Sequence, residues 1–294
     1  MNEKNLVRAI TCDGSAYVLV CNSTEIVNKA SEIHRTSKTM TAALGRALTA
    51  ASLMGSMLKN EKNSLTLQFK CDGPAQNIVC VSDWHGNVRG YADNPSAELP
   101  PNDKGKLDVG GVVGGGTLYV IRDVGMNEPY VGMCPIESGE IAEDITNYYA
   151  RSEQTPTACA LGVLVDKDLT CLAAGGFMVQ LLPGADDDVI TKIEENISKI
   201  QPVSRMVQQG MSPLEIASEV FKNIEFDVLD DAYVEYKCNC SREKYEKVMI
   251  SLGKKELEQL KQENEPVETV CNFCNSKYVF SIDELDKMIN ASKR

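Results

Sequence analysis

The chain has 294 residues, 43% of them hydrophobic, which is enough for about two domains with buried cores. Aromatic residues make up only 6%, so we expect these cores to be aliphatic. The 42 acidic residues outnumber the 30 basic ones, and the net charge of −12 argues against a nucleic-acid binder, which needs a cationic face to neutralise phosphates.

The chain opens with polar residues and lacks the apolar segment of a secretion signal. Its longest apolar-leaning stretch, residues 42–58, includes Arg46 and is too short and too polar to cross a bilayer. We therefore expect a cytoplasmic protein with reduced thiols and no membrane partner. Its 11 cysteines should then be packing residues, metal ligands or redox centres. The two histidines, His34 and His85, are too few for a three-histidine catalytic zinc site, and we interpret them as surface or packing residues.

Residues 1–183 have the pattern of a mixed α/β domain. A long helix is expected at residues 38–58, where small apolar side chains recur at helical spacing. A strand pair joined through Asp13 and Gly14 precedes this helix, and alternating or β-branched runs follow it. The expected strands are residues 6–10, 17–21, 65–70, 77–82, 88–91, 118–122, 160–165 and 169–173, with a further helix at 141–151.

Two other features of this region receive structural interpretations. The glycine-rich run at residues 110–116 lacks the Lys-Ser/Thr pair of a phosphate-binding loop, so we interpret it as a turn or mobile loop. Seven cysteines lie mostly in expected strands and are interpreted as small buried packing residues. They are Cys12, Cys21, Cys71, Cys80, Cys134, Cys159 and Cys171.

The composition changes after Pro183. Residues 184–231 contain 11 acidic and 4 basic residues, a balance of −7. An amphipathic helix is expected at residues 189–200, preceded by three aspartates whose charge suits a helix N-terminus better than a metal site. Pro202 breaks this helix, and Ser212, Pro213 and Glu215 together predict the start of another. We predict that residues 184–231 form a metastable helical linker.

Residues 232–294 form a third segment of about 60 residues, where a core alone gives marginal stability and a covalent or metal staple is often needed. Cys238 and Cys240 form a C-x-C pair, and Cys271 and Cys274 form a C-x-x-C pair after 30 intervening residues. Two close cysteine pairs flanking a helical insert fit a tetrahedral four-thiolate zinc site with one ion. The predicted fold class is therefore α+β: an N-terminal mixed α/β domain with β-sheets and a long helix, a helical linker, and a small C-terminal four-cysteine zinc domain.

Thiolate chemistry suggests more than a structural role for this cluster. Zinc keeps the sulfurs as thiolates, the form that oxidants attack, and both pairs can close disulfides, the C-x-C pair in a small strained ring. Structural zinc sites contribute roughly 10–16 kcal/mol, more than the net stability of a domain this small. Oxidation would then eject the ion and unfold the domain. The residue chemistry permits this switch without requiring it, and a plain structural zinc knuckle remains an alternative.

At this point the chain resembles a known family, the redox-regulated heat-shock holdases, or thirty-three-kilodalton bacterial chaperonins. The resemblance rests first on the C-x-C and C-x-x-C pairs with 30 residues between them. It extends in order through the alanine-rich helix at 44–58 and the segments 65–74, 89–92, 152–156 and 174–183. It covers nearly the whole chain. The seven further cysteines are a departure that raises the chance of side oxidation.

The resemblance implies an ATP-independent chaperone and no enzyme activity. In its reduced, zinc-loaded form such a protein is monomeric and inactive. Oxidation would form the disulfides Cys238–Cys240 and Cys271–Cys274, release zinc, unfold the zinc domain and linker, and give a homodimer that binds unfolding client proteins. The exposed linker would present apolar side chains that we expect to include client contacts: Val189, Ile193, Ile197, Ile200, Met206, Val207, Leu214, Ile216 and Val220.

Two other classes of function compete with this interpretation. A zinc-ribbon module for nucleic acid is disfavoured by the net charge of −12 and by the near-neutral C-terminal segment. A thiol–disulfide oxidoreductase would place C-x-x-C at the start of a helix after a strand, whereas a strand-like run, residues 277–280, follows Cys274. We therefore predict neither nucleic-acid binding nor catalysis.

Overall fold

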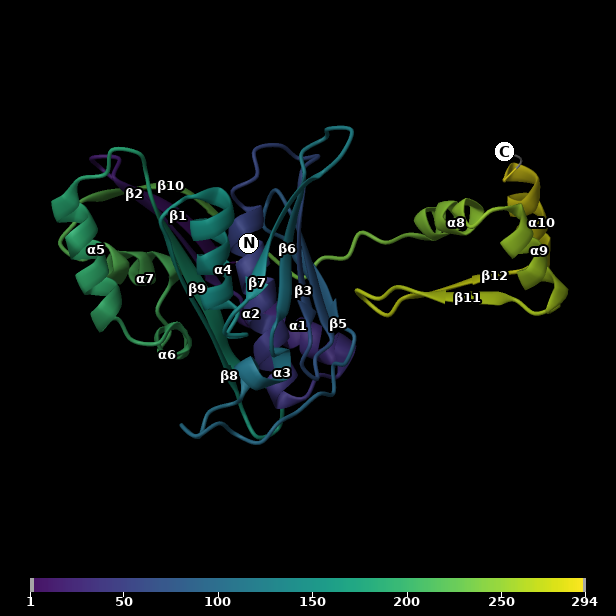
Figure 1. Ribbon diagram of the computed structural model, residues 1–294, viewed down its shortest axis with the longest axis horizontal. Helices are drawn as coiled ribbons and strands as arrows, with labels where there is room; N and C mark the ends of the chain where they lie inside the picture. The colour runs from purple at the N-terminus through teal and green to yellow at the C-terminus, as the bar shows by residue number, and fades with distance from the viewer. Residues whose placement is uncertain (1–2, 293–294) are drawn as a thin grey trace. The chain divides into compact units, whose positions relative to one another are not determined.

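The computed structural model describes residues 3–292, which fall into two compact units divided after Lys237 (Figure 1). The division based on the sequence (residues 1–183, 184–231 and 232–294) placed residues 232–237 with the C-terminal part. In the structure these residues belong to the first unit. The fold is α+β, as the sequence predicted, with two five-stranded sheets in the first unit and a two-stranded sheet in the second.

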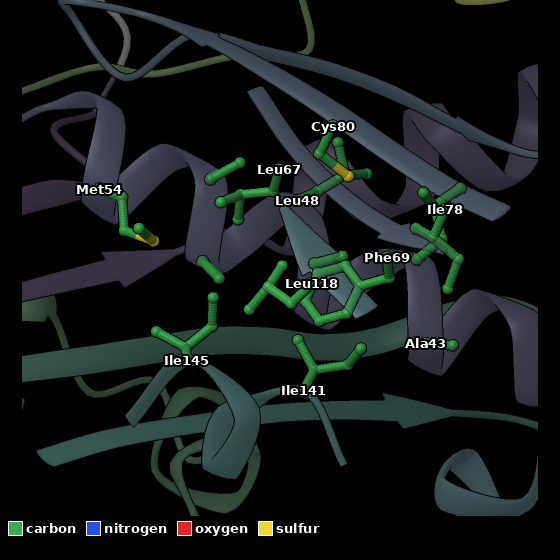
Figure 2. Packing of buried hydrophobic residues seen from close by; sticks show 14 of the residues in the cluster. Ala43, Leu48, Met54, Leu67, Phe69, Ile78, Cys80, Leu118, Ile141 and Ile145 are labelled. Carbon is green, nitrogen blue, oxygen red and sulfur yellow. The ribbon is translucent and has the colours of Figure 1, made fainter. Parts of the chain in front are cut away.

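The centre of the first unit is the helix α2, Lys38–Gly55. Ser37 caps its start, because the side-chain oxygen accepts a hydrogen bond from the Met40 backbone N–H at 3.1 Å. Nearly every residue of α2 is buried, because this helix of mostly small side chains contacts both sheets. Figure 2 shows Leu48 of α2 packed near Leu67 and Leu118 of one of these sheets.

The first sheet has the strand order β10-β1-β2-β9-β8, and each neighbouring pair is antiparallel. Its strands are β1 Leu6–Thr11, β2 Ala16–Asn22, β8 Thr157–Val165, β9 Cys171–Leu181 and β10 Phe226–Ala232. Both of its faces are covered. Leu19 and Cys21 of β2 belong to the core around α2, whereas Val18 and Val20 belong to a separate core on the opposite face.

The second sheet has the order β5-β4-β3-β6-β7 and is also antiparallel. Its strands are β3 Ser64–Cys71, β4 Asn77–Asp83, β5 Val88–Ala92, β6 Gly116–Asp123 and β7 Tyr130–Ile136. Alternate side chains such as Leu65, Leu67 and Phe69 are buried, which gives β3 the period of two that the sequence showed.

Three helices cover the outer face of the first sheet: α5 Asp187–Lys199, α6 Val203–Gln208 and α7 Pro213–Val220 (Figure 1). Ile193, Met206 and Ile216 are their buried contacts with a core that includes Phe177 and Val179 of β9. The helices expected on either side of Pro202 are therefore present. The segment is not helical throughout, however, because it continues into strand β10, which pairs with β1.

The structure contains elements that the sequence patterns did not predict. Helix α1, Thr24–His34, and strand β7 had no expected counterpart. The glycine-rich run predicted as a turn or mobile loop begins within a short helix, α3 Val109–Val113, which Asp108 caps by accepting a hydrogen bond from Gly111 N–H at 2.9 Å. The helix expected at 141–151 is shorter, α4 Ala142–Tyr148, and continues as a π-helical turn at Tyr149–Glu153.

The second unit is small. It contains α8 Arg242–Ser251, α9 Lys254–Gln262, the hairpin of β11 Val267–Val270 with β12 Lys277–Phe280, and α10 Ile282–Ala291. Its buried hydrophobic core consists of Met249, Leu257, Phe280, Leu285 and Met288. So few buried side chains provide little stability, as expected for a unit of this size.

The N-terminus of α7 gives a local test of linker stability. Ser212 Oγ accepts from Glu215 N–H at 3.3 Å, and Glu215 Oε2 accepts from Ser212 N–H at 2.7 Å, which completes the capping box that the sequence predicted. We predict that Ser212→Ala lowers the stability of α7 by about 1 kcal/mol. The measurement is hydrogen exchange of the α7 amides, which should accelerate roughly fivefold. Ser218→Ala, in the middle of the same helix, is the control and should not accelerate exchange, because alanine favours a helix interior; equal acceleration in both variants would contradict the capping role.

Candidate metal centre

The four C-terminal cysteines are brought together by a turn and by the irregular segment that opens the second unit. Cys271 and Cys274 lie in the turn between β11 and β12, which is closed by hydrogen bonds from Cys271 N–H to Ser276 O (2.9 Å) and from Asn275 N–H to Cys271 O (2.8 Å). Asn275 has a φ of +57°, a left-handed conformation that asparagine tolerates well. Cys238 and Cys240 precede α8, and the Lys244 ammonium holds the backbone between them through Asn239 O at 2.6 Å.

The four sulfurs lie close enough together to bind one metal ion. The four Sγ atoms all lie within 4.8 Å of one another. The Sγ atoms of Cys238 and Cys271 are 3.7 Å apart, and those of Cys240 and Cys274 are 3.3 Å apart. Zinc–thiolate bonds of about 2.3 Å in a tetrahedron require sulfur–sulfur separations of about 3.8 Å. The four residues therefore fit one ion, with Cys271 buried and the other three partly exposed.

Two tyrosines lie against the sulfurs. The Tyr278 hydroxyl of β12 donates to Cys240 Sγ at 3.0 Å, and its ring stacks on Tyr245 of α8 at a centroid distance of 4.8 Å. Burial opposes ionisation of Cys271, but hydrogen bonds from the Tyr245 hydroxyl and from the backbone of Phe273 and Cys274 lower its pKa to about 7. Burial instead raises the pKa of both Cys238 and Cys240. Hydrogen-bond donors at the sulfurs stabilise the thiolate form that a metal requires.

The remaining predicted residues do not join this centre. In the part of the chain that the structure describes, this is the one cluster of metal-ligating side chains. Most of the other cysteines are buried or partly buried, as predicted. Burial raises the pKa of Cys21, Cys71, Cys159 and Cys171 to about 12 and that of Cys134 to about 11, which makes them poor nucleophiles. Cys12 differs from the expected packing role because it is exposed at the end of β1.

The histidines take part in ordinary contacts. His34 ends α1 and lies 3.2 Å from the Tyr236 hydroxyl, and His85 stacks near Trp84 at a centroid distance of 4.0 Å. The sequence analysis missed Tyr245 and Tyr278 as partners of the cysteines. Tyr278 lies four residues after Cys274, but its hydrogen bond to Cys240 depends on the fold of the hairpin.

Tyr278 allows a test of whether hydrogen bonds to the sulfurs increase the metal affinity of the site. Tyr278→Phe keeps the ring but removes the hydrogen bond to Cys240 Sγ, so we predict a 10- to 100-fold loss of affinity for an added metal ion, with zinc as the probe, the usual effect of removing a partner of a metal ligand. The measurement is competition with a chromophoric chelator. Val279→Thr, an exposed neighbour on the same strand, is the control. Equal affinities of Tyr278→Phe and the unmodified protein would show that the hydroxyl does not support the metal.

Across residues 3–292, the structure contains no helix that is both long enough and apolar enough to cross a membrane.

The sequence matches the family described as "Hsp33 protein" over residues 4–281. It is 45% identical to the 33 kDa chaperonin of Lachnoclostridium phytofermentans over 98% of both chains. It is 46% identical to the 33 kDa chaperonin of Clostridium acetobutylicum over 97% of this chain and 96% of that one.

A solved structure shows the same fold. The crystal structure of the 33 kDa chaperonin (heat shock protein 33 homolog) from Thermotoga maritima matches with a TM-score of 0.89 and 38% identity, over 98% of this chain and 99% of that one. These relatives are named as chaperones and not as enzymes. The chain therefore belongs to the Hsp33 family of chaperones, in agreement with the resemblance that its cysteine pairs and N-terminal motifs had indicated.

Proposed function

We propose that the protein is a redox-regulated, ATP-independent holdase whose switch is the four-cysteine centre. The observation that carries this proposal is the convergence of Cys238, Cys240, Cys271 and Cys274 in a unit whose buried core is very small. Loss of the central ion would remove a large share of that unit's stability. As a chaperone of this family, the protein binds unfolded client proteins.

The proposed metal is one zinc ion in the reduced state. Four thiolates in tetrahedral array are soft ligands that suit zinc, and a site with four protein ligands leaves no open position for substrate chemistry. Such a site is structural as long as the thiolates remain reduced. We propose that the protein works in the cytoplasm, where thiols are kept reduced in the absence of oxidative stress.

The proposed trigger is oxidation of all four thiolates by an oxidant such as peroxide. Each disulfide takes two electrons from a pair of thiols and reduces one peroxide molecule to two waters. We propose the pairing Cys238–Cys240 and Cys271–Cys274, which follows the family resemblance. The shortest sulfur contacts instead join Cys238 with Cys271 and Cys240 with Cys274, so the folded geometry does not itself favour the proposed pairing.

Peptide mapping under non-reducing conditions tests this pairing. After oxidation and digestion, we predict a fragment in which Cys238 and Cys240 are bonded to each other, with no peptide attached from the region of Cys271. A cross-linked fragment that joins residues near Cys238 to residues near Cys271 would contradict the proposal. The reduced protein is the control, and in it all four of these cysteines should be alkylated.

Linker release is proposed to create the client-binding surface. Helices α5 to α7 cover an apolar sheet face that includes Val18, Val20, Phe177 and Val179. If residues 184–231 unfold with the zinc domain, both this face and the apolar side of the helices become available to a client. The acidic balance of the linker would help keep the complex soluble. We further propose that the oxidised form is a homodimer and that nucleic acid is not a partner.

Light scattering from a heat-unfolding client protein tests the proposed function. The reduced, zinc-loaded protein should leave aggregation unchanged, and the protein treated with peroxide at mild heat should suppress it. Suppression by both forms would indicate a chaperone without this switch. If neither form suppresses aggregation, the protein is not a holdase that peroxide activates.

A linker variant tests whether release of the helices is the activating step. Ile216 of α7 is fully buried against the first sheet, so Ile216→Ala should weaken docking by roughly 2–5 kcal/mol. We predict that the reduced variant suppresses client aggregation without oxidation while it still binds one zinc ion. Leu214→Ala, at an exposed position of the same helix, is the matched control and should stay inactive when reduced. If hydrogen exchange of the linker accelerates but the reduced Ile216→Ala protein does not suppress aggregation, release of the helices is not the activating step.

A further inference from the structure

The last four residues of the first unit, 234–237, lie along an edge of the second sheet. We call them the strap. They follow β10 after one residue, Tyr233, so the chain first pairs with β1 at the edge of the first sheet and then runs beside β5 at the edge of the second. Cys238, the first of the four clustered cysteines, is the next residue. The strap therefore connects the core of the first unit to the proposed redox centre through the backbone itself.

The strap behaves as a short parallel strand. Val88 N–H of β5 donates to Glu235 O at 3.0 Å, and Lys237 N–H donates to Val88 O at 2.8 Å. The Tyr236 hydroxyl donates to Gly90 O at 2.8 Å and accepts from Gly90 N–H at 3.3 Å. Four backbone groups of the β5 edge are thus satisfied by the strap. The N–H and C=O of Gly90, however, bond to the Tyr236 hydroxyl and not to backbone groups of the strap.

The side chains of the strap alternate as in a strand. Val234 is 1% exposed and Tyr236 packs partly buried against the main core, whereas Glu235 and Lys237 are exposed. Asn5 holds the start of the strap, because its side chain donates to Val234 O at 2.9 Å and accepts from Val234 N–H at 2.7 Å. The edge therefore accepts an extended segment with apolar side chains at every second position.

We propose that the strap is a removable occupant of the β5 edge, and that an extended, alternately apolar segment of an unfolded client binds this edge once the strap is released. The inference rests on the proposed function, because oxidation must first free the chain around Cys238. Removal of the strap would expose the N–H and C=O groups of Val88 and Gly90, an unpaired edge that a second chain can extend by backbone hydrogen bonding. A client backbone can pair with Gly90 directly, where the strap offers only the Tyr236 hydroxyl.

This edge is separate from the sheet face under α5 to α7, because that face belongs to the first sheet and β5 belongs to the second. Binding at the edge uses backbone groups, which every client possesses, and requires of the client sequence only apolar side chains at every second position. Binding at the face uses apolar side chains alone. The two surfaces would recognise two general properties of an unfolded protein.

Hydrogen exchange of residues 88–92 tests the proposal in the full-length protein. In the reduced form, the Val88 and Gly90 amides should be protected. After oxidation at mild heat they should exchange at least tenfold faster, and addition of a heat-unfolded client should restore their protection. If the oxidised protein holds the client in light scattering but these amides stay exposed, or if they never lose protection, the proposal is wrong and the holdase function stands. If the oxidised protein holds no client, both are overturned.

A conservative variant tests the strap without oxidation. Tyr236→Phe keeps the ring in the core and removes the hydroxyl that bonds both backbone groups of Gly90. In the reduced protein it should accelerate exchange of the Gly90 amide roughly fivefold, the effect of losing one net hydrogen bond. Tyr233→Phe removes a hydroxyl that bonds Glu25 outside the strap and is the matched control. Equal exchange at Gly90 in the two variants would show that Tyr236 does not hold the strap on β5.

Discussion

The convergence of four cysteine sulfurs is the constraint on which the second unit depends. Its hydrophobic core is formed by a few side chains of α8 to α10 and β12, and the metal site joins the two ends of its helical insert. Under the proposed function, such a unit would respond to thiol chemistry as a whole, because the sulfurs that would bind the ion are also the atoms that an oxidant attacks.

The first unit differs from the second because it has a large hydrophobic core. Helix α2 is buried between two sheets in an extensive aliphatic core, which gives that part of the molecule stability that does not depend on a metal. Within this unit, the chain from α5 to residue 237 packs on the outside of the two sheets through one apolar face and two strand edges. Helices α5 to α7 pack on a core that is separate from the one around α2, whereas Val234 of the strap is buried in the core around α2 itself. A stable scaffold that retains its fold while a covering segment departs is what a switchable holdase requires.

Much of this arrangement was predictable from local sequence patterns. The long helix, most strands, the capping box at Ser212 and the cysteine cluster all depend on spacing within a short stretch, and the structure contains them. The features that escaped prediction depend on distant partners. Strand β10 is an acidic stretch that forms a strand because β1 offers a free edge, and Tyr236 gains its role only where β5 places Gly90 beside it. Tyr278 likewise became visible as a partner of Cys240 only through the hairpin register.

The central claim is that loss of the metal centre propagates into the segment that covers the sheets. It is tested most directly by hydrogen exchange followed through oxidation at mild heat, with zinc release recorded in parallel. Protection should be lost first in residues 242–291 and then in residues 187–237, while α2 and β3 remain protected. If zinc leaves and the protein holds clients while residues 187–237 keep their protection, the account is wrong.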